Sequence, residues 1–174
     1  ITSGLTSAIN HLVIRAEDSG SWQQPRGKQA GDTRWPIDYD PIIGIWQTVW
    51  LEPVQSSHIV STATGYKMTE QCLDLTINLS GQVQGSLQIS LRQSAREVSE
   101  LTIDTGSRSE IKASLPINSP ELWSPDSPVL YDLYIKLLSS SGEQLDSIQS
   151  YTGLREINIL DGKLCLNQQP LYIK

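Results

Sequence analysis

Alternation of apolar and polar residues is the feature of this sequence that most limits its possible folds. In Gln71–Ser80, the odd-numbered positions from Leu73 to Leu79 are aliphatic, while the positions between them are mostly polar. A period of two residues is that of a β-strand with one buried face. Helical periodicity is nearly absent from the chain. The sequence therefore predicts an all-β fold.

Six further stretches show the same alternation, and turns rich in glycine and serine separate them. They lie around Ile59, Leu87–Leu91, Leu101, Ile111–Leu115, Tyr131–Leu137 and Ile148. About seven short strands at roughly ten-residue spacing are typical of an immunoglobulin-like β-sandwich. We therefore expect such a sandwich over residues 54–152, without the cysteine pair of antibody domains.

Two strand-like runs, Asn10–Glu17 and Ile42–Leu51, flank a long polar connection in the first part of the chain. Trp46 and Trp50 share one face of the second run, so we expect a buried strand at a domain junction. Pro53 lacks a backbone donor and ends that strand. Two strands alone are marginal in water, so these runs should belong to a sheet whose other strands lie elsewhere. Their open edges favour association with a second copy, a possible homo-oligomer.

Charge and composition exclude several classes of function. The formal net charge is -6 and Lys and Arg do not cluster, so no nucleic-acid partner is expected. No apolar run approaches the roughly 20 residues that span a bilayer, so we expect a soluble protein. Cys72, Cys165, His11 and His58 lack the spacing of a disulfide framework or a metal site, so no metal and no cofactor are expected. The compartment stays open between cytoplasm, periplasm and secretion.

Five stretches of the sequence resemble glycoside hydrolase family 2, and they occur in the family's order. They are INHLVIRAED at Ile9–Asp18, QQPRGKQ at Gln23–Gln29, GIWQTVWLEPV at Gly44–Val54, ELWSPDSPVLYDL at Glu121–Leu133, and YTGLREINILDGKLCLNQQPLYIK at Tyr151–Lys174. The resemblance implies three parts. Residues 1–53 would end the family's jelly-roll, sugar-binding-like domain, 54–152 would form the immunoglobulin-like sandwich, and 153–174 would be a linker and hairpin leading into a (β/α)8 catalytic barrel. We expect the chain to be a piece of a longer protein.

The resemblance implies a bacterial-type retaining enzyme of the β-galactosidase, β-glucuronidase and β-mannosidase group, which hydrolyses O-glycosyl bonds in carbohydrate metabolism. Retaining cleavage needs two carboxylates about 5 to 5.5 Å apart. In this family both are Glu residues at barrel strand ends, the acid/base following an Asn, and this sequence has no Asn-Glu dipeptide. We therefore assign no catalytic residue. We expect a non-catalytic accessory region, whose partners are the barrel, the rest of the jelly-roll domain and, through them, a carbohydrate.

The alternative is a stand-alone carbohydrate-binding or adhesive sandwich module. The tail LCLNQQPLYIK favours the accessory region, because a free module has no need of a segment that leads into a barrel.

The polar connection between the two strand-like runs holds the candidate substrate-binding residues. In several family members an Asp shortly before the Gly-Ile motif reaches the active-site pocket, and the resemblance places Asp38 there, with Asp40 as the competitor if the loop is shifted. A carboxylate suits this role because it accepts strong hydrogen bonds from neighbouring hydroxyls. The structural alternative is an Asp that hydrogen-bonds its own turn.

Trp22 and Trp35 lie in the same connection. An indole face can stack on a sugar ring, and the alternative is packing against the barrel, since tryptophan buries a large area. Further along the chain, we expect Trp123 to be structural and Arg155 to fix the exit toward the barrel.

Overall fold

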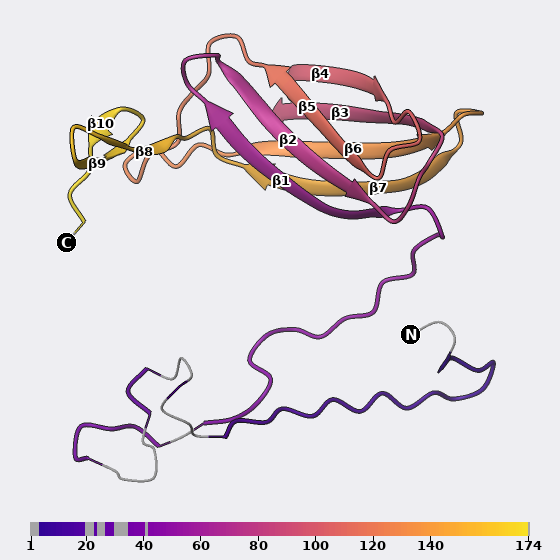
Figure 1. The fold of residues 1–174 in the computed structure, drawn as a ribbon, viewed down its shortest axis with the longest axis vertical. Helices are drawn as coiled ribbons and strands as arrows, with labels where there is room; N and C mark the ends of the chain where they lie inside the picture. The colour runs from indigo at the N-terminus through magenta and orange to yellow at the C-terminus, as the bar shows by residue number, and fades with distance from the viewer. Residues whose placement is uncertain (1–3, 20–22, 24–26, 30–34, 41, 174) are drawn as a thin grey trace. The chain divides into compact units, whose positions relative to one another are not determined.

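The computed structural model describes residues 4–19, 23, 27–29, 35–40 and 42–173. The chain divides into two compact units, Ile1–Glu52 and Pro53–Lys174. All strands of the described chain lie in the second unit (Figure 1).

Seven strands form the larger part of the second unit, and each falls where alternation predicts one. Their bounds are β1 Ile59–Lys67, β2 Cys72–Leu79, β3 Gly85–Gln93, β4 Arg96–Asp104, β5 Glu110–Pro116, β6 Tyr131–Ser139 and β7 Gln144–Thr152. Neighbouring strands pair antiparallel throughout. The predicted immunoglobulin-like sandwich is confirmed.

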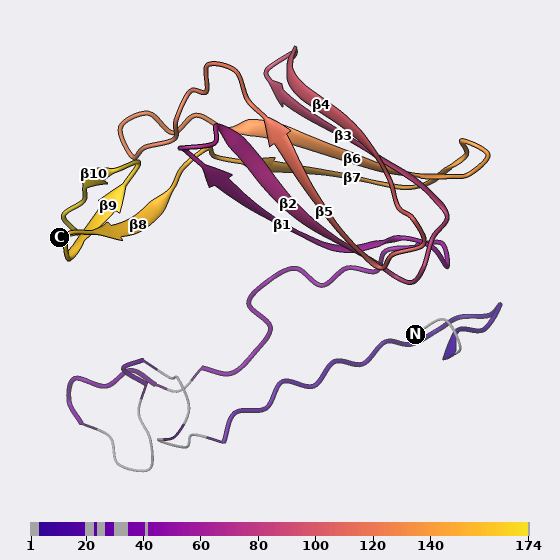
Figure 2. The same cartoon turned by 45° about the horizontal axis from the view of Figure 1, so that its top comes forward.

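The seven strands form two sheets, in the orders β1-β2-β5 and β4-β3-β6-β7. The sheets stack as two layers, as both views of the ribbon show (Figures 1 and 2). β2 is central in the three-stranded sheet, while β3 and β6 are central in the four-stranded sheet. The edges are therefore β1 and β5 in one layer and β4 and β7 in the other.

Aliphatic side chains from the two inner faces fill the space between the layers. Ile77, Ile89 and Ile135, which come from three different strands, are each at most 1% exposed. Each fully buried aliphatic side chain stabilises the fold by about 1.5 to 3 kcal/mol. The alternation read from the sequence is thus the alternation between core and solvent.

Tyr131 fixes the start of β6 from within the core. Its side chain is buried, and its hydroxyl accepts a hydrogen bond from the backbone N–H of Glu121 at 2.9 Å. Burial raises the pKa of Tyr131 above its ordinary value, so the phenol stays protonated. A tyrosine that ties this strand to backbone upstream is a recurrent feature of immunoglobulin domains. It holds the long connection between β5 and β6 in place.

Gly85 and Thr105 close the end of the sandwich where β3 begins. A Cβ at Gly85 would lie 1.9 Å from the carbonyl oxygen of Leu138, so glycine is required for the close approach of β3 and β6. The Thr105 side chain is fully buried, and its hydroxyl donates to the carbonyl of Val83. Its N–H donates to the carbonyl of Gly85 at 3.0 Å. This buried polar group is therefore satisfied.

A small sheet follows the sandwich. β8 (Ile157–Leu160), β9 (Lys163–Leu166) and β10 (Gln169–Pro170) pair antiparallel in the order β10-β9-β8. The first turn consists of Asp161 and Gly162, with φ values of 48° and 73°. Left-handed conformations at both positions are those of a tight two-residue hairpin turn.

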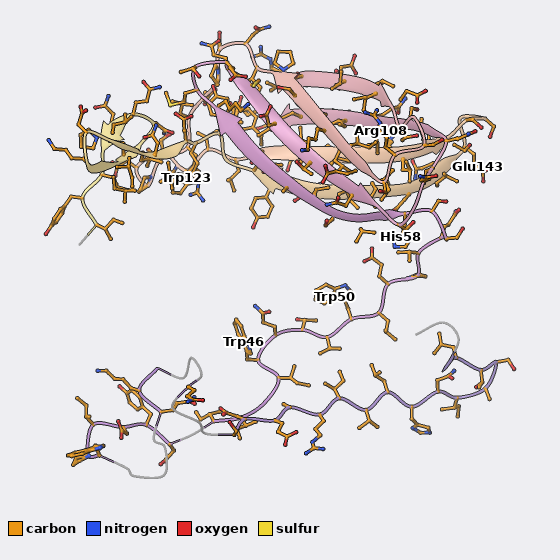
Figure 3. All side chains as sticks on the ribbon, in the orientation of Figure 1. Trp46, Trp50, His58, Arg108, Trp123 and Glu143 are labelled. Atoms are coloured by element: carbon orange, nitrogen blue, oxygen red, sulfur yellow. The ribbon has the colours of Figure 1, made fainter. Side chains whose placement is uncertain are left out.

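The described part of the first unit contains no strand, which corrects the prediction for Asn10–Glu17 and Ile42–Leu51. Trp46 and Trp50 are 87% and 72% exposed (Figure 3), so their burial at a domain junction stays a prediction for the longer protein. The lack of strands has a physical reason: an alternating segment becomes a strand when a neighbouring strand supplies ladder hydrogen bonds. The described residues offer neither run such a neighbour.

Because the core belongs to the second unit, we expect the polypeptide Val54–Lys174 to fold alone and to unfold in one cooperative transition. Leu133→Ala should lower the free energy of unfolding by about 2 to 5 kcal/mol, since it empties a fully buried site. Lys112→Ala, at an exposed position of β5, should change it by no more than about 0.5 kcal/mol. Urea unfolding followed by circular dichroism measures the transition of Val54–Lys174 and the effects of both substitutions. A broad transition in Val54–Lys174 would contradict a self-sufficient core.

Candidate functional site

Trp35 and Asp38 are joined by two hydrogen bonds across a tight turn of the first unit. The backbone N–H of Trp35 donates to Oδ2 of Asp38 at 2.9 Å, and the backbone N–H of Asp38 donates to the carbonyl of Trp35, also at 2.9 Å. The carboxylate therefore has the turn-forming role that the sequence offered as an alternative.

The two sides of this loop are tied to each other. The Tyr39 N–H donates to the carbonyl of Lys28 at 2.9 Å, and Gln29 pairs with Tyr39 in an isolated parallel bridge. Asp40 is exposed immediately after this bridge. Trp22 lies outside the described residues, so its part in the site stays a prediction.

The turn presents an aromatic ring next to a carboxylate. Trp35 is 63% exposed, and Asp38 is half-buried. This combination suits a sugar, whose C–H face can stack on an indole while its hydroxyls donate to carboxylate oxygens. The structure thus brings together two of the four candidate residues, and their binding role stays a prediction.

Neither a metal-binding cluster nor a membrane-crossing helix occurs among the described residues. They contain no group of three or more His, Cys, Asp or Glu side chains that could hold a metal ion. Nδ1 of His58 contacts the carbonyl of Gln55 at 2.7 Å, and the His58 N–H donates to Oγ of Ser80 at 2.9 Å, so this histidine serves the start of β1. Cys72 and Cys165 are free and buried. Within this part of the chain, no helix has the length and apolar character to cross a membrane.

Trp123 holds the small sheet β8–β10 to the sandwich (Figure 3). The backbone N–H of Trp123 donates to the carbonyl of Leu154 at 2.9 Å, and its backbone carbonyl accepts from Nδ2 of Asn167 at 2.9 Å. The Arg155 guanidinium lies over the indole, 4.4 Å from the ring centroid. Gly153 packs so closely that a Cβ there would lie 3.0 Å from the Trp123 side chain. Trp123 therefore has the expected structural role, and it binds Arg155 where the chain leaves the sandwich.

Asn167 completes this junction, and the sequence analysis did not single it out. Its Oδ1 accepts from the Glu156 N–H at 3.0 Å, and its own N–H donates to the Glu156 carbonyl at 2.8 Å. Asn167 and Gln168 have φ values of 51° and 64°, so they form a two-residue turn between β9 and β10. Asn is enriched in this left-handed conformation. An Asn between two short apolar runs was the signal that could have identified the turn.

A hollow of about 420 Å³ opens beside this junction, between the edge strands β1 and β7. Tyr66 lines it, and burial raises the pKa of its phenol above the ordinary value, so this wall is neutral. Leu130 and Tyr151 also line it, and they are 49% and 71% exposed. The hollow therefore offers apolar surface next to Arg155.

Residues 54–155, which contain the sandwich and extend to Arg155, match the family described as Glycosyl hydrolases family 2. The match covers more than half of the chain. The chain belongs to glycosyl hydrolase family 2. The resemblance identified in the sequence is thereby confirmed.

Two curated relatives show how much of a family 2 protein this chain represents. The beta-galactosidase of Leuconostoc mesenteroides subsp. mesenteroides is 29% identical over 147 residues, which cover 75% of this chain and 14% of the relative. The beta-galactosidase of Thermoanaerobacter pseudethanolicus is 28% identical over 159 residues, covering 79% of this chain and 20% of the relative. The family 2 chain therefore spans a fifth or less of the length of these relatives.

Two solved beta-glucuronidase structures share the fold. Ruminococcus gnavus beta-glucuronidase superimposes with a TM-score of 0.54 at 19% identity, over 68% of this chain and 19% of that chain. The beta-D-glucuronidase of Dictyoglomus thermophilum gives a TM-score of 0.55 at 22% identity, over the same shares, 68% and 19%. At these identities the similarity concerns the fold.

Asn167→Ala should lower the free energy of unfolding by about 1 to 3 kcal/mol, because the Trp123 carbonyl and the Glu156 N–H both lose a partner. Gln168→Gly, at the neighbouring turn position, should instead raise it by about 1 kcal/mol, because glycine adopts a positive φ without strain. Denaturant unfolding measures both, and amide hydrogen exchange should show early loss of protection in β8 and β9 of Asn167→Ala. Equal stability of Asn167→Ala and the parent protein would contradict the role of Asn167 in the junction.

Proposed function

We propose that this chain is the non-catalytic accessory region of a retaining glycoside hydrolase, which supports the catalytic barrel and completes one wall of the substrate pocket. The observation that carries the proposal is the extent of the match. Residues 54–155 match the family, while the aligned part of the chain covers 14% and 20% of two beta-galactosidase relatives. In this proposal the rest of the protein supplies the hydrolytic chemistry and most of the sugar specificity.

The residues of the chain support a role without chemistry of its own. Retaining hydrolysis needs an acid/base and a nucleophile, both carboxylates, on either side of the bond. The sequence contains no Asn-Glu dipeptide, the form in which the family resemblance implies the acid/base. The chain therefore acts on the reaction through the position of other parts of the enzyme.

The small sheet β8–β10 supplies a surface on which a barrel can pack. Ile157 and Ile159 share one face of β8 and are 57% and 73% exposed. Neighbouring exposed apolar side chains of this kind can mark an interaction site. The hydrogen bond from Nδ2 of Asn167 to the Trp123 carbonyl holds this surface to the sandwich. A domain that packs on β8–β10 is therefore held in a fixed position relative to the sandwich.

The turn at Trp35–Asp38 supplies the contact with the substrate in this proposal. Its two internal hydrogen bonds orient the carboxylate, and in this proposal the carboxylate and the exposed indole contact a terminal sugar. Asp40 is the competing carboxylate, and Trp22 the second aromatic candidate. A preorganised loop carboxylate contributes most where its hydrogen bonds tighten in the transition state.

The purified chain is expected to show no hydrolysis of chromogenic β-galactoside, β-glucuronide or β-mannoside substrates, because the proposal places both catalytic carboxylates outside it. Continuous spectrophotometric assays at high protein concentration measure the rates. Turnover that follows the protein through a second, independent purification would disprove the proposal.

In the full-length enzyme, Asp38→Ala should lower kcat/KM by about 10- to 150-fold, the effect of losing a charge-assisted hydrogen bond worth about 1.5 to 3 kcal/mol. Asp38→Asn is the matched variant, because its amide oxygen can still accept from the Trp35 N–H and keep the turn. A substrate role predicts that Asp38→Asn is also impaired. Steady-state kinetics and thermal melting of each variant separate activity from folding.

Asp40→Ala distinguishes the two carboxylates. If Asp40→Ala is impaired while both Asp38 variants retain the parental kcat/KM, the substrate contact lies two residues further along the loop. If all three variants retain it, the loop carboxylates are turn formers, and the substrate contact proposed for this loop is wrong.

A further inference from the structure

The outer face of the four-stranded sheet carries rows of polar side chains that cross its strands. In one row Ser90 of β3 lies between Glu100 of β4 and Tyr134 of β6, and Tyr134 in turn pairs with Gln149 of β7. Alternation directs these side chains away from the core, because Ile89 and Ile135, their neighbours along the strands, are buried. The face is therefore polar around the Tyr134 ring.

Hydrogen bonds and a ring contact order the side chains around Tyr134. The Arg92 guanidinium lies over the ring, 5.2 Å from its centroid, and Nε2 of Gln149 donates to the Tyr134 hydroxyl at 3.1 Å. Nε of Arg92 donates to Oγ of Ser90 at 3.2 Å, and Oγ of Ser90 donates to Oε2 of Glu97 at 3.2 Å. Polar side chains held in this way lose little rotamer freedom when a ligand binds.

A break in strand register brings Glu97 into this network. The pairing of β3 with β4 shifts between Leu91 and Arg92, so that Leu91 faces Ser99 while Arg92 faces Glu97. Arg92 and Glu97 then approach to 3.7 Å. Bulges at sheet edges redirect side chains and are frequent beside functional sites. The irregularity of β4 thus assembles the polar network.

These side chains line a hollow of about 420 Å³. Its charged residues are two cations, Arg92 and Lys136, and two anions, Glu97 and Glu100, so the charges balance. Arg92 has more N–H donors than its bond to Ser90 uses, and the Tyr134 hydroxyl donates to no acceptor among the described residues. The hollow therefore offers both donors and acceptors without favouring a charged ligand.

We propose that this hollow on the outer face of β4-β3-β6 is a second carbohydrate site, which binds a neutral oligosaccharide through residues other than those of the Trp35–Asp38 turn. Sugar hydroxyls are both donors and acceptors, which matches the mixture of guanidinium, hydroxyl, amide and carboxylate groups. The Tyr134 ring supplies the apolar contact for a C–H face. The site lies within the sandwich and does not depend on the role proposed for the first unit.

A polyhydroxylated ligand fits this surface better than a protein partner does. Protein interfaces are built around buried aromatic or aliphatic anchors with charged residues depleted at the centre. No exposed large apolar side chain lines this hollow, and its centre is charged and hydrogen-bonded. The balanced charge also disfavours nucleic acids and acidic polysaccharides.

The test uses the whole chain and four tetrasaccharides: cellotetraose, β-1,4-mannotetraose and β-1,4-galactotetraose as neutral probes, and tetragalacturonate as the charged one. We expect at least one neutral probe to bind with a Kd of roughly 0.1 to 1 mM by isothermal titration calorimetry. Tyr134→Ala and Arg92→Ala should each weaken that binding about tenfold. Arg92→Lys should not restore it, because an ammonium lacks the planar fork of donors.

Lys112→Ala is the control, since Lys112 is equally a solvent-facing cation but lies on β5 of the other sheet. It should leave the Kd within about twofold of the parent value. Thermal melting establishes that each variant is folded. If Tyr134→Ala does not fold, Tyr134→Phe, which keeps the ring, replaces it in the binding experiment. Three outcomes overturn the proposal: no neutral probe saturates by roughly 10 mM, the folded Tyr134 and Arg92 variants bind like the parent chain, or tetragalacturonate binds more tightly than every neutral probe.

Discussion

Burial of aliphatic side chains between two sheets is the interaction on which the rest of this structure depends. Ile77, Ile89 and Ile135 meet there from both layers and are almost completely withdrawn from water. Because side chains alternate along a strand, burying one face commits the other to solvent. Arg92 and Tyr134 are thus placed on the outer face by the same alternation that fills the core.

The sandwich could be predicted because each of its strands carries its own period-two signal. The run Ile42–Leu51 was predicted to be a strand from its apolar residues, yet the structure forms no strand there, because suitable residues supply no partner for the backbone. The hydrogen bonds of Asp38 to its own turn were foreseen as an alternative. The sugar contact proposed for Asp38 depends on residues outside the turn.

Other features could not be read from the sequence because they depend on tertiary contacts. Glu97 joins Arg92 through a shift in register, and Asn167 reaches Trp123 across 44 positions of the chain. Neither has a local pattern that distinguishes it from an ordinary turn or surface residue. Sites of this kind are assembled by strand pairing, so sequence reasoning identifies the strands more readily than the groups that gather on them.

The short stretch from Glu121 to Trp123 serves two structures at once. Glu121 binds the hydroxyl of Tyr131 at the start of β6, and two residues later Trp123 binds Leu154 and Asn167. A displacement of the small sheet is therefore transmitted to a central strand of the sandwich, because no flexible linker separates the two. The sandwich therefore holds the small sheet rigidly. A domain packed on the small sheet would have a fixed orientation as well as a fixed position.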